Sequence, residues 1–165
     1  LPFGRGRAYG SSWNSFANAL FGGWQVGGLV TLRSGLPFDV SYPGDPQNTG
    51  TVNRGDRIGA GALSNPTIDR WFDEFAFVQS APGVFGNTGR NILFGPGTTN
   101  CDFMAGKVFR MPWEGHRLQF RFESFNFTNT PRFGQPNVNL RDPATATIAS
   151  AEEPRRIQFG LKYIF

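Results

Sequence analysis

The chain has 165 residues, enough for one domain with its own core but hardly for two. It holds 18 Phe, 22 Gly and 12 Pro but only one His and one Cys, a composition typical of β architectures with many turns. A lone cysteine excludes an internal disulfide, and no apolar run reaches the roughly 18 residues of a transmembrane helix. The net charge of +4 is carried almost wholly by Arg, which suits pairing with aromatic rings or anionic groups, or reflects only a moderately basic domain.

The chain opens on Leu1-Pro2-Phe3, without a leader, and we expect it to be part of a longer polypeptide. A helix is predicted over 11–21, because apolar side chains recur there at helical spacing, at Trp13, Phe16, Ala17, Leu20 and Phe21. Ser11 or Ser12 is expected to cap this helix, and Gly22 to end it. The helix fits either a membrane interface or a plug at the end of a barrel.

One long strand is predicted over 23–42. Its apolar side chains alternate with polar ones, at Trp24, Val26, Val30, Leu32, Leu36, Phe38, Val40 and Tyr42. Strands usually have five or six residues, so a strand of nearly twenty is typical of barrels that extend beyond the membrane. Pro37 predicts a kink or an edge position within it.

Two long connections, 43–99 and 131–153, are predicted as loops because they are rich in Gly, Asn, Asp and Pro. Within the first, the segment 71–75 is expected to fold locally. The turn over 111–116, in contrast, is short. Long loops on one side and short turns on the other are the pattern of outer-membrane barrels.

Three further strands are predicted over 100–110, 117–128 and 154–165. In the second, the alternation shifts by one residue at Ser124, which indicates either a β-bulge or the end of the strand. The last strand alternates over ten residues, about the length that crosses a bilayer when tilted, although a soluble sandwich gives the same alternation in shorter strands. We expect 117–128 and 154–165 to pair antiparallel. The fold class predicted is all-β, an antiparallel meander of long barrel-type strands with one short helix, forming a single partial barrel segment over 1–165.

No arrangement of residues predicts catalysis. His116 lies in a short turn two residues from Glu114, and Cys101 has no histidine at a recognisable distance, so neither is expected to react. The loop acids match no calcium-loop spacing. A single Arg-Gly stretch over 4–10 is explained as well by a turn as by nucleic-acid binding. We therefore expect no enzymatic activity, no cofactor, no metal and no nucleic-acid partner.

The polar side chains of the strands predict the lining of a wide barrel, a wall rather than a binding site. This lumen-facing set comprises Arg33, Arg117, Gln119, Arg121, Glu123, Arg156, Gln158 and Lys162.

The order of several short motifs resembles the late barrel of TonB-dependent outer-membrane receptors, in the branch with an N-terminal carboxypeptidase-regulatory-like domain. The resemblance covers nearly the whole chain. The motifs are Leu-Pro-Phe-Gly-Arg-Gly at 1–6, Gly-Gly-Trp-Gln-Val-Gly-Gly at 22–28, Ser-Gly-Leu-Pro-Phe at 34–38, Trp-Phe at 71–72, Phe-Gly-Asn-Thr-Gly-Arg-Asn at 85–91, Phe-Gly-Pro-Gly at 94–97, Phe-Asn-Phe-Thr-Asn at 125–129 and Arg-Ile-Gln-Phe-Gly-Leu-Lys at 156–162.

The resemblance implies a barrel of about 22 strands around a plug, importing scarce nutrients with energy from an inner-membrane complex. These 165 residues contain neither the plug nor the TonB box. The alternating apolar residues that end at Phe165 are similar to the signal read by the barrel-assembly machinery. This signal comprises Ile157, Phe159, Leu161, Tyr163 and Phe165.

Two functions follow as hypotheses. The first is the C-terminal barrel portion of such a transporter, in the outer membrane of a Gram-negative-type bacterium, with lipid, the rest of the barrel and the assembly machinery as partners. The second is a self-associating extracellular β-structural subunit, a composite barrel or a fibre, because four strands cannot close a barrel and open edges pair with further copies.

Overall fold

The computed structural model describes residues 1–48, 50 and 53–165, which divide into two compact units. The first unit contains most of a four-stranded sheet and one helix, and the second contains the long connections. The first consists of Leu1–Thr31, Thr99–Thr130 and Glu153–Phe165, and the second of Leu32–Thr98 and Pro131–Glu152.

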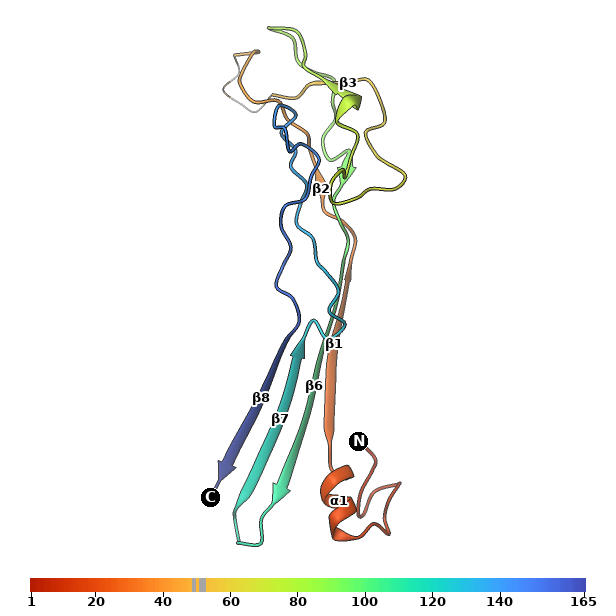
Figure 1. The fold of residues 1–165 in the computed structure, drawn as a ribbon, viewed down its shortest axis with the longest axis vertical. Coiled ribbons are helices and arrows are strands. Elements are labelled where there is room, and N and C mark those ends of the chain that lie inside the picture. The colour runs from red at the N-terminus through yellow and green to blue at the C-terminus, as the bar shows by residue number, and fades with distance from the viewer. Residues whose placement is uncertain (49, 51–52) are drawn as a thin grey trace. The chain divides into compact units, whose positions relative to one another are not determined.

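The four-stranded sheet has the order β1-β6-β7-β8 (Figure 1). Its strands are β1 (Gln25–Arg33), β6 (Thr98–Arg110), β7 (Arg117–Phe125) and β8 (Arg156–Ile164). The pairs β6–β7 and β7–β8 are antiparallel. Together with the presence of one short α-helix among the described residues, this confirms the predicted all-β antiparallel fold class.

The register of β7 and β8 runs from Arg117 opposite Ile164 to Phe125 opposite Arg156. The predicted pairing of 117–128 with 154–165 is therefore confirmed. The β6–β7 turn is closed by the Met111 N–H, which donates to the His116 carbonyl at 3.1 Å. This short turn and the long β7–β8 connection lie at opposite ends of the sheet.

The helix α1 (Ser15–Phe21) is shorter than predicted. The predicted caps Ser11 and Ser12 are wrong, because Asn14 accepts the Ala17 N–H at 2.8 Å and caps α1 instead. A turn precedes it, in which the Trp13 N–H donates to the carbonyl of Gly10, a residue with φ of 80°. The helix ends at Gly22, as predicted.

The strand predicted over 23–42 is interrupted in the structure. β1 ends at Arg33, and β2 (Pro37–Phe38) pairs with β5 (Leu93–Phe94) in a separate two-stranded sheet. Between them, Gly35 approaches another backbone so closely that a Cβ there would lie 1.8 Å from the Gly95 carbonyl oxygen. This close approach, followed by Pro37 without an N–H to donate, separates the two strands.

The phase shift at Ser124 marks the end of a strand and not a bulge. The pairing of β7 with β8 continues without a break through Ser124 to Phe125. Asn126 follows with φ of 50°, and its side-chain oxygen accepts the Thr130 N–H at 3.0 Å. Phe125 is therefore the last residue of β7, and Phe127 lies in the turn that follows it.

The segments predicted as loops fold together into the second unit, which has a hydrophobic core that the sequence analysis missed. Besides β2 and β5, it contains β3 (Asp56–Arg57) paired with β4 (Phe77–Val78), and the 3₁₀ helix η1 (Glu74–Ala76). The Phe72 ring lies 5.6 Å from Phe38 and 6.4 Å from Phe77, centroid to centroid. The core consists of Phe38, Val40, Phe72, Ala76, Phe77, Leu93 and Ala146.

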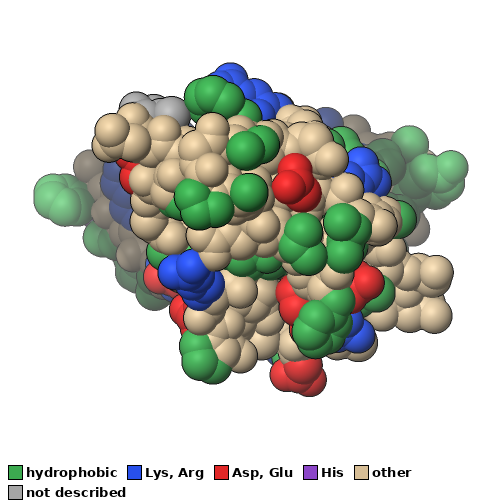
Figure 2. All heavy atoms as spheres, turned by 90° about the horizontal axis from the view of Figure 1, so that it is seen from above, with side chains coloured by type: hydrophobic (Ala, Val, Ile, Leu, Met, Phe, Trp, Pro, Cys, Tyr) green, Lys and Arg blue, Asp and Glu red, His purple; other side chains and the backbone are tan. Residues whose placement is uncertain are grey.

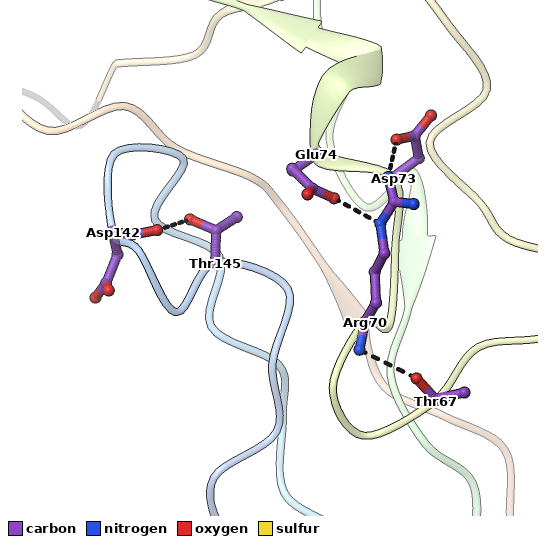
Figure 3. A network of polar contacts seen from close by, with 6 residues as sticks. All are labelled: Thr67, Arg70, Asp73, Glu74, Asp142 and Thr145. Carbon is purple, nitrogen blue, oxygen red and sulfur yellow. Dashed lines mark hydrogen bonds and ion pairs between the residues drawn. The ribbon is translucent and has the colours of Figure 1, made fainter.

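Polar contacts fix the turns of the second unit (Figure 3). The Arg70 guanidinium lies 2.6 Å from the Asp73 carboxylate and 3.0 Å from the Glu74 carboxylate. The backbone N–H of Arg70 donates to the Thr67 hydroxyl at 3.2 Å. The Arg70 and Asp73 side chains are exposed, so these ion pairs contribute little free energy and mainly orient the chain before η1.

The pKa values of Tyr42 and Asp142, both in the second unit, are shifted. Burial raises the pKa of the Tyr42 phenol, an effect that the nearby Arg141 charge opposes, and the hydroxyl donates to the Phe77 carbonyl at 3.0 Å. The Ala144 N–H and the Asn137 side chain donate to Asp142, and these hydrogen bonds hold the pKa of its carboxyl below the ordinary 3.8.

Seen from above (Figure 2), hydrophobic side chains lie apart from one another, with acidic, basic and other polar groups between them. In the part of the chain that the structure describes, no helix combines the length and hydropathy needed to cross a bilayer.

We predict that Phe72→Ala in the full-length protein destabilises the second unit by about 3–5 kcal/mol, because it leaves a cavity at a side chain that is 1% exposed. Phe75→Ala is the matched control, since Phe75 is 74% exposed and should cost less than about 1 kcal/mol. Native-state hydrogen exchange of the amides of β4 and β5 measures both. Equal effects of the two substitutions would contradict the core described here.

We predict that the turn around Asp142 loosens in acid. The pKa of the Asp142 carboxyl is lower in the folded chain than its ordinary 3.8. The stabilisation by the ionised carboxylate is therefore complete above pH 3.8 and is lost as the pH falls through the lowered pKa of the folded state. Hydrogen exchange at the Ala144 amide, corrected for its intrinsic pH dependence, should show this loss. The variant Asp142→Asn carries no titrating group and should give a flat profile over the same range; a matching slope would refute the assignment.

Candidate functional site

The four-stranded sheet carries almost all of the predicted site residues, on two faces that differ in chemistry. Residues paired across neighbouring strands share a face, and Phe120 lies opposite Leu161 and Phe122 opposite Phe159. This apolar face contains Leu118, Phe120, Phe122, Ile157, Phe159, Leu161 and Tyr163.

Aromatic rings on the apolar face contact one another across the strands, and the part of this face on β8 is exposed. The Phe159 ring lies 5.4 Å from Phe122 and 6.2 Å from Phe120, centroid to centroid. Phe159 is 70% exposed, Leu161 69% and Phe165 91%. A contiguous apolar surface of this kind marks a site of contact with lipid or with another protein.

The opposite face carries the polar set. Gln158 donates a hydrogen bond to the Glu123 carboxylate, and the Arg121 guanidinium lies 3.5 Å from the same carboxylate. The Arg156 guanidinium stacks over the Phe125 ring at 5.1 Å. This polar face contains Arg117, Gln119, Arg121, Glu123, Arg156, Gln158 and Lys162, so its cations outnumber its acid.

Arg33 is the predicted lumen residue that this face does not include. It is the last residue of β1 and belongs to the second unit. Its assignment to the lumen stays a prediction, as do the roles of the other residues.

The two outer strands of the sheet, β1 and β8, each have one open edge. β1 and β8 stand at the ends of the strand order, so within the described residues each has a single neighbour in this sheet. Exposed strand edges present unpaired N–H and C=O groups, which pair with further strands.

Sequence reasoning missed Lys107, a cation on the apolar face. Its partner across the β6–β7 pair is Phe120, yet its side chain is buried. Its ammonium donates to the Asn18 carbonyl at 3.1 Å and the Ala19 carbonyl at 2.6 Å, near the C-terminal end of α1. The charge thus adds a donor to the Asn18 carbonyl, which also accepts the Gly22 N–H, and supplies one to the Ala19 carbonyl near the negative end of the helix dipole. The only signal in the sequence was a lysine in phase with Phe103 and Phe109.

The turn histidine also has a structural partner. His116 Nδ1 shares a hydrogen bond with the Tyr163 hydroxyl and so links the β6–β7 turn to β8. Among the described residues, no three His, Cys, Asp or Glu side chains gather where they would hold a metal ion.

This sheet, with one apolar face, one polar face, a short turn at one end and long connections at the other, has the features of a membrane-barrel wall. The family model described as "Outer membrane beta barrel domain" matches residues 1–158. The chain belongs to this family. No match was found among curated proteins or among solved structures. Membership in this barrel family points to the outer membrane of a Gram-negative-type bacterium.

We predict that the two faces of β8 tolerate charge very differently. In the full-length barrel protein, Phe159→Lys should destabilise the fold by about 2–4 kcal/mol, the effect of a lysine on a lipid-facing position near the membrane midplane. The neighbouring Gln158→Lys should cost less than about 1 kcal/mol, because it points to the polar face beside Glu123. Unfolding in lipid vesicles, followed by the heat-dependent shift in gel mobility, measures both. A larger effect at position 158 would reverse the assignment of the faces.

Proposed function

We propose that the chain forms the closing strands of a TonB-dependent outer-membrane receptor that imports nutrients. The observation that carries this proposal is the four-stranded sheet, with an exposed apolar face on one side and a polar, mainly cationic face on the other. The order of the receptor-like motifs along the chain supports the same conclusion.

In this proposal the apolar face meets lipid and the polar face lines the lumen. The outer edges of β1 and β8 pair with further strands of the same barrel, because an unpaired backbone group in hydrocarbon costs several kcal/mol. The second unit, formed by the long connections, lies outside the cell, since such barrels have long extracellular loops. The chain acts as a wall, without enzymatic activity, cofactor or nucleic-acid partner.

The terminal strand also serves assembly in this proposal. β8 presents Phe159 and Leu161 on its apolar face, and the Phe165 ring stacks 6.2 Å from Tyr163 just beyond the strand. An exposed strand edge that ends in aromatic rings suits recognition by the barrel-assembly machinery, which is the proposed partner during insertion.

A self-associating subunit is the second candidate. Two open edges and an exposed apolar face favour it, because further copies can pair along β1 and β8 and cover the aromatic side chains. Such an assembly would act outside the cell, as a composite barrel or a fibre.

The native mass and energised uptake separate the two candidates. An antibody against the second unit should detect a receptor-sized protein in outer-membrane fractions. A strain lacking the protein should leave in its medium a nutrient that wild-type cells remove, and a protonophore should abolish the difference between the strains. Mass spectrometry of the spent medium identifies that nutrient without prior assumption.

A native polypeptide of about 18.2 kDa in large assemblies, with no uptake difference that depends on the proton gradient, would refute the transporter and favour the self-associating subunit.

A further inference from the structure

The helix α1 lies against the apolar side of the sheet. The Trp24 ring stands 6.0 Å from Phe120 on the apolar face, and its indole N–H donates to the Leu20 carbonyl in α1 at 2.8 Å. Lys107, in register with Phe120, binds the helix carbonyls. Two independent contacts therefore hold α1 on the side of the sheet that faces lipid in the proposed barrel.

The helix is also placed at one end of the sheet. Figure 1 shows α1 at the same end as the β6–β7 turn. In outer-membrane barrels the short turns are periplasmic, so α1 lies at the periplasmic interface of the bilayer. Its outward side chains Phe16, Leu20 and Phe21 are exposed, as in a helix whose apolar side enters the membrane at headgroup level.

A cavity of about 480 Å³ opens beside α1, lined by the N-terminal segment, the helix and the end of β6. Arg5, Arg7, Lys107 and Arg110 line it, and none of the described lining residues is acidic. The cavity thus combines several cations with a position next to a lipid-facing helix.

Three of these cations remain available to a ligand. Lys107 is occupied by the helix carbonyls. Arg5 uses its Nε to bind the Trp13 carbonyl at 2.8 Å, which leaves both terminal amino groups without a hydrogen bond in the described chain. Arg7 and Arg110 are exposed and have no side-chain partner among the described residues. A guanidinium with free donors matches the oxygens of a phosphate in bidentate geometry.

We propose that this cavity binds the phosphodiester of an anionic glycerophospholipid in the periplasmic leaflet, with Arg5, Arg7 and Arg110 as its ligands and the acyl chains beside α1. Arg110 lies opposite Arg117, in phase with the polar face, but it is the last residue of β6 and lines the cavity from the end of the strand. Basic pockets at the membrane face of a protein are suited to such headgroups. The inference rests on the barrel orientation proposed above. It adds a lipid site that neither the wall nor the transport function requires.

Native mass spectrometry of the full-length protein, titrated with phosphatidylglycerol or phosphatidylcholine, tests the site. The wild type should bind phosphatidylglycerol about tenfold more tightly than phosphatidylcholine, and the variant R5Q/R7Q/R110Q should lose this preference. The matched control R54Q/R90Q/R141Q removes the same charge from the second unit and should keep it. Equal binding of both lipids, or an unchanged triple variant, would overturn the proposal.

A single-residue variant and a competition experiment test the site further. R7Q alone removes a side chain without an intrachain partner and should weaken phosphatidylglycerol binding at least about twofold even if the triple variant does not fold; unchanged binding would count against the site. Inorganic phosphate should not displace the lipid at equal concentration. Displacement would assign the cavity to free phosphate and overturn the lipid.

This experiment fails separately from the proposed function. Lipid binding is measured without uptake, so a negative result leaves the transporter intact. A reversed response of Phe159→Lys and Gln158→Lys would instead refute the orientation on which both proposals depend.

Discussion

The antiparallel register of β7 and β8 decides which side chains lie on each face of the sheet. Side chains alternate along a strand, so a shift of one residue would bring Phe159 to the face of Glu123 and move every aromatic of β8 to the polar side. In the observed register Phe159 lies opposite Phe122 and Gln158 opposite Glu123. β6 keeps the same phase, with Lys107 opposite Phe120. One pairing therefore places most aromatic side chains on one face and most charged ones on the other, with Lys107 and Phe125 as exceptions.

The two units differ in whether they bury their apolar side chains. The buried apolar residues of the described chain, such as Phe72 and Val40, belong to the second unit, which removes them from water by its own packing. In the first unit, Phe159 and Leu161 stay exposed, and no further strand among the described residues pairs with the outer edges of β1 and β8. In the proposed barrel its stability depends on lipid and on additional strands, whereas that of the second unit depends on its core.

The sequence predicted the sheet well because alternation is a local signal. The pairing of 117–128 with 154–165 and the separation of the β8 residues by face followed from period two alone. The second unit was missed because its core joins Phe38, Phe72 and Ala146, which are far apart in the chain and follow no period. The end of β1 depends on the contact of Gly35 with Gly95, which lie far apart in the chain and cannot be read from a single segment. The cap at Asn14 is local, and it was missed because Ser11 and Ser12 are equally suitable cap residues a few positions earlier.

Lys107 is a charged residue on the otherwise apolar face, and it links the sheet to helix α1. A lysine on a lipid-facing position is unfavourable unless its charge finds partners, and here the carbonyls of Asn18 and Ala19 supply them. The helix in turn gains a cation where its dipole is negative. This mutual compensation holds α1 on the apolar side of the sheet. If that side meets lipid and the polar face around Arg121 lines the lumen, as we propose, the contacts of Lys107 favour the membrane interface over the plug for this helix.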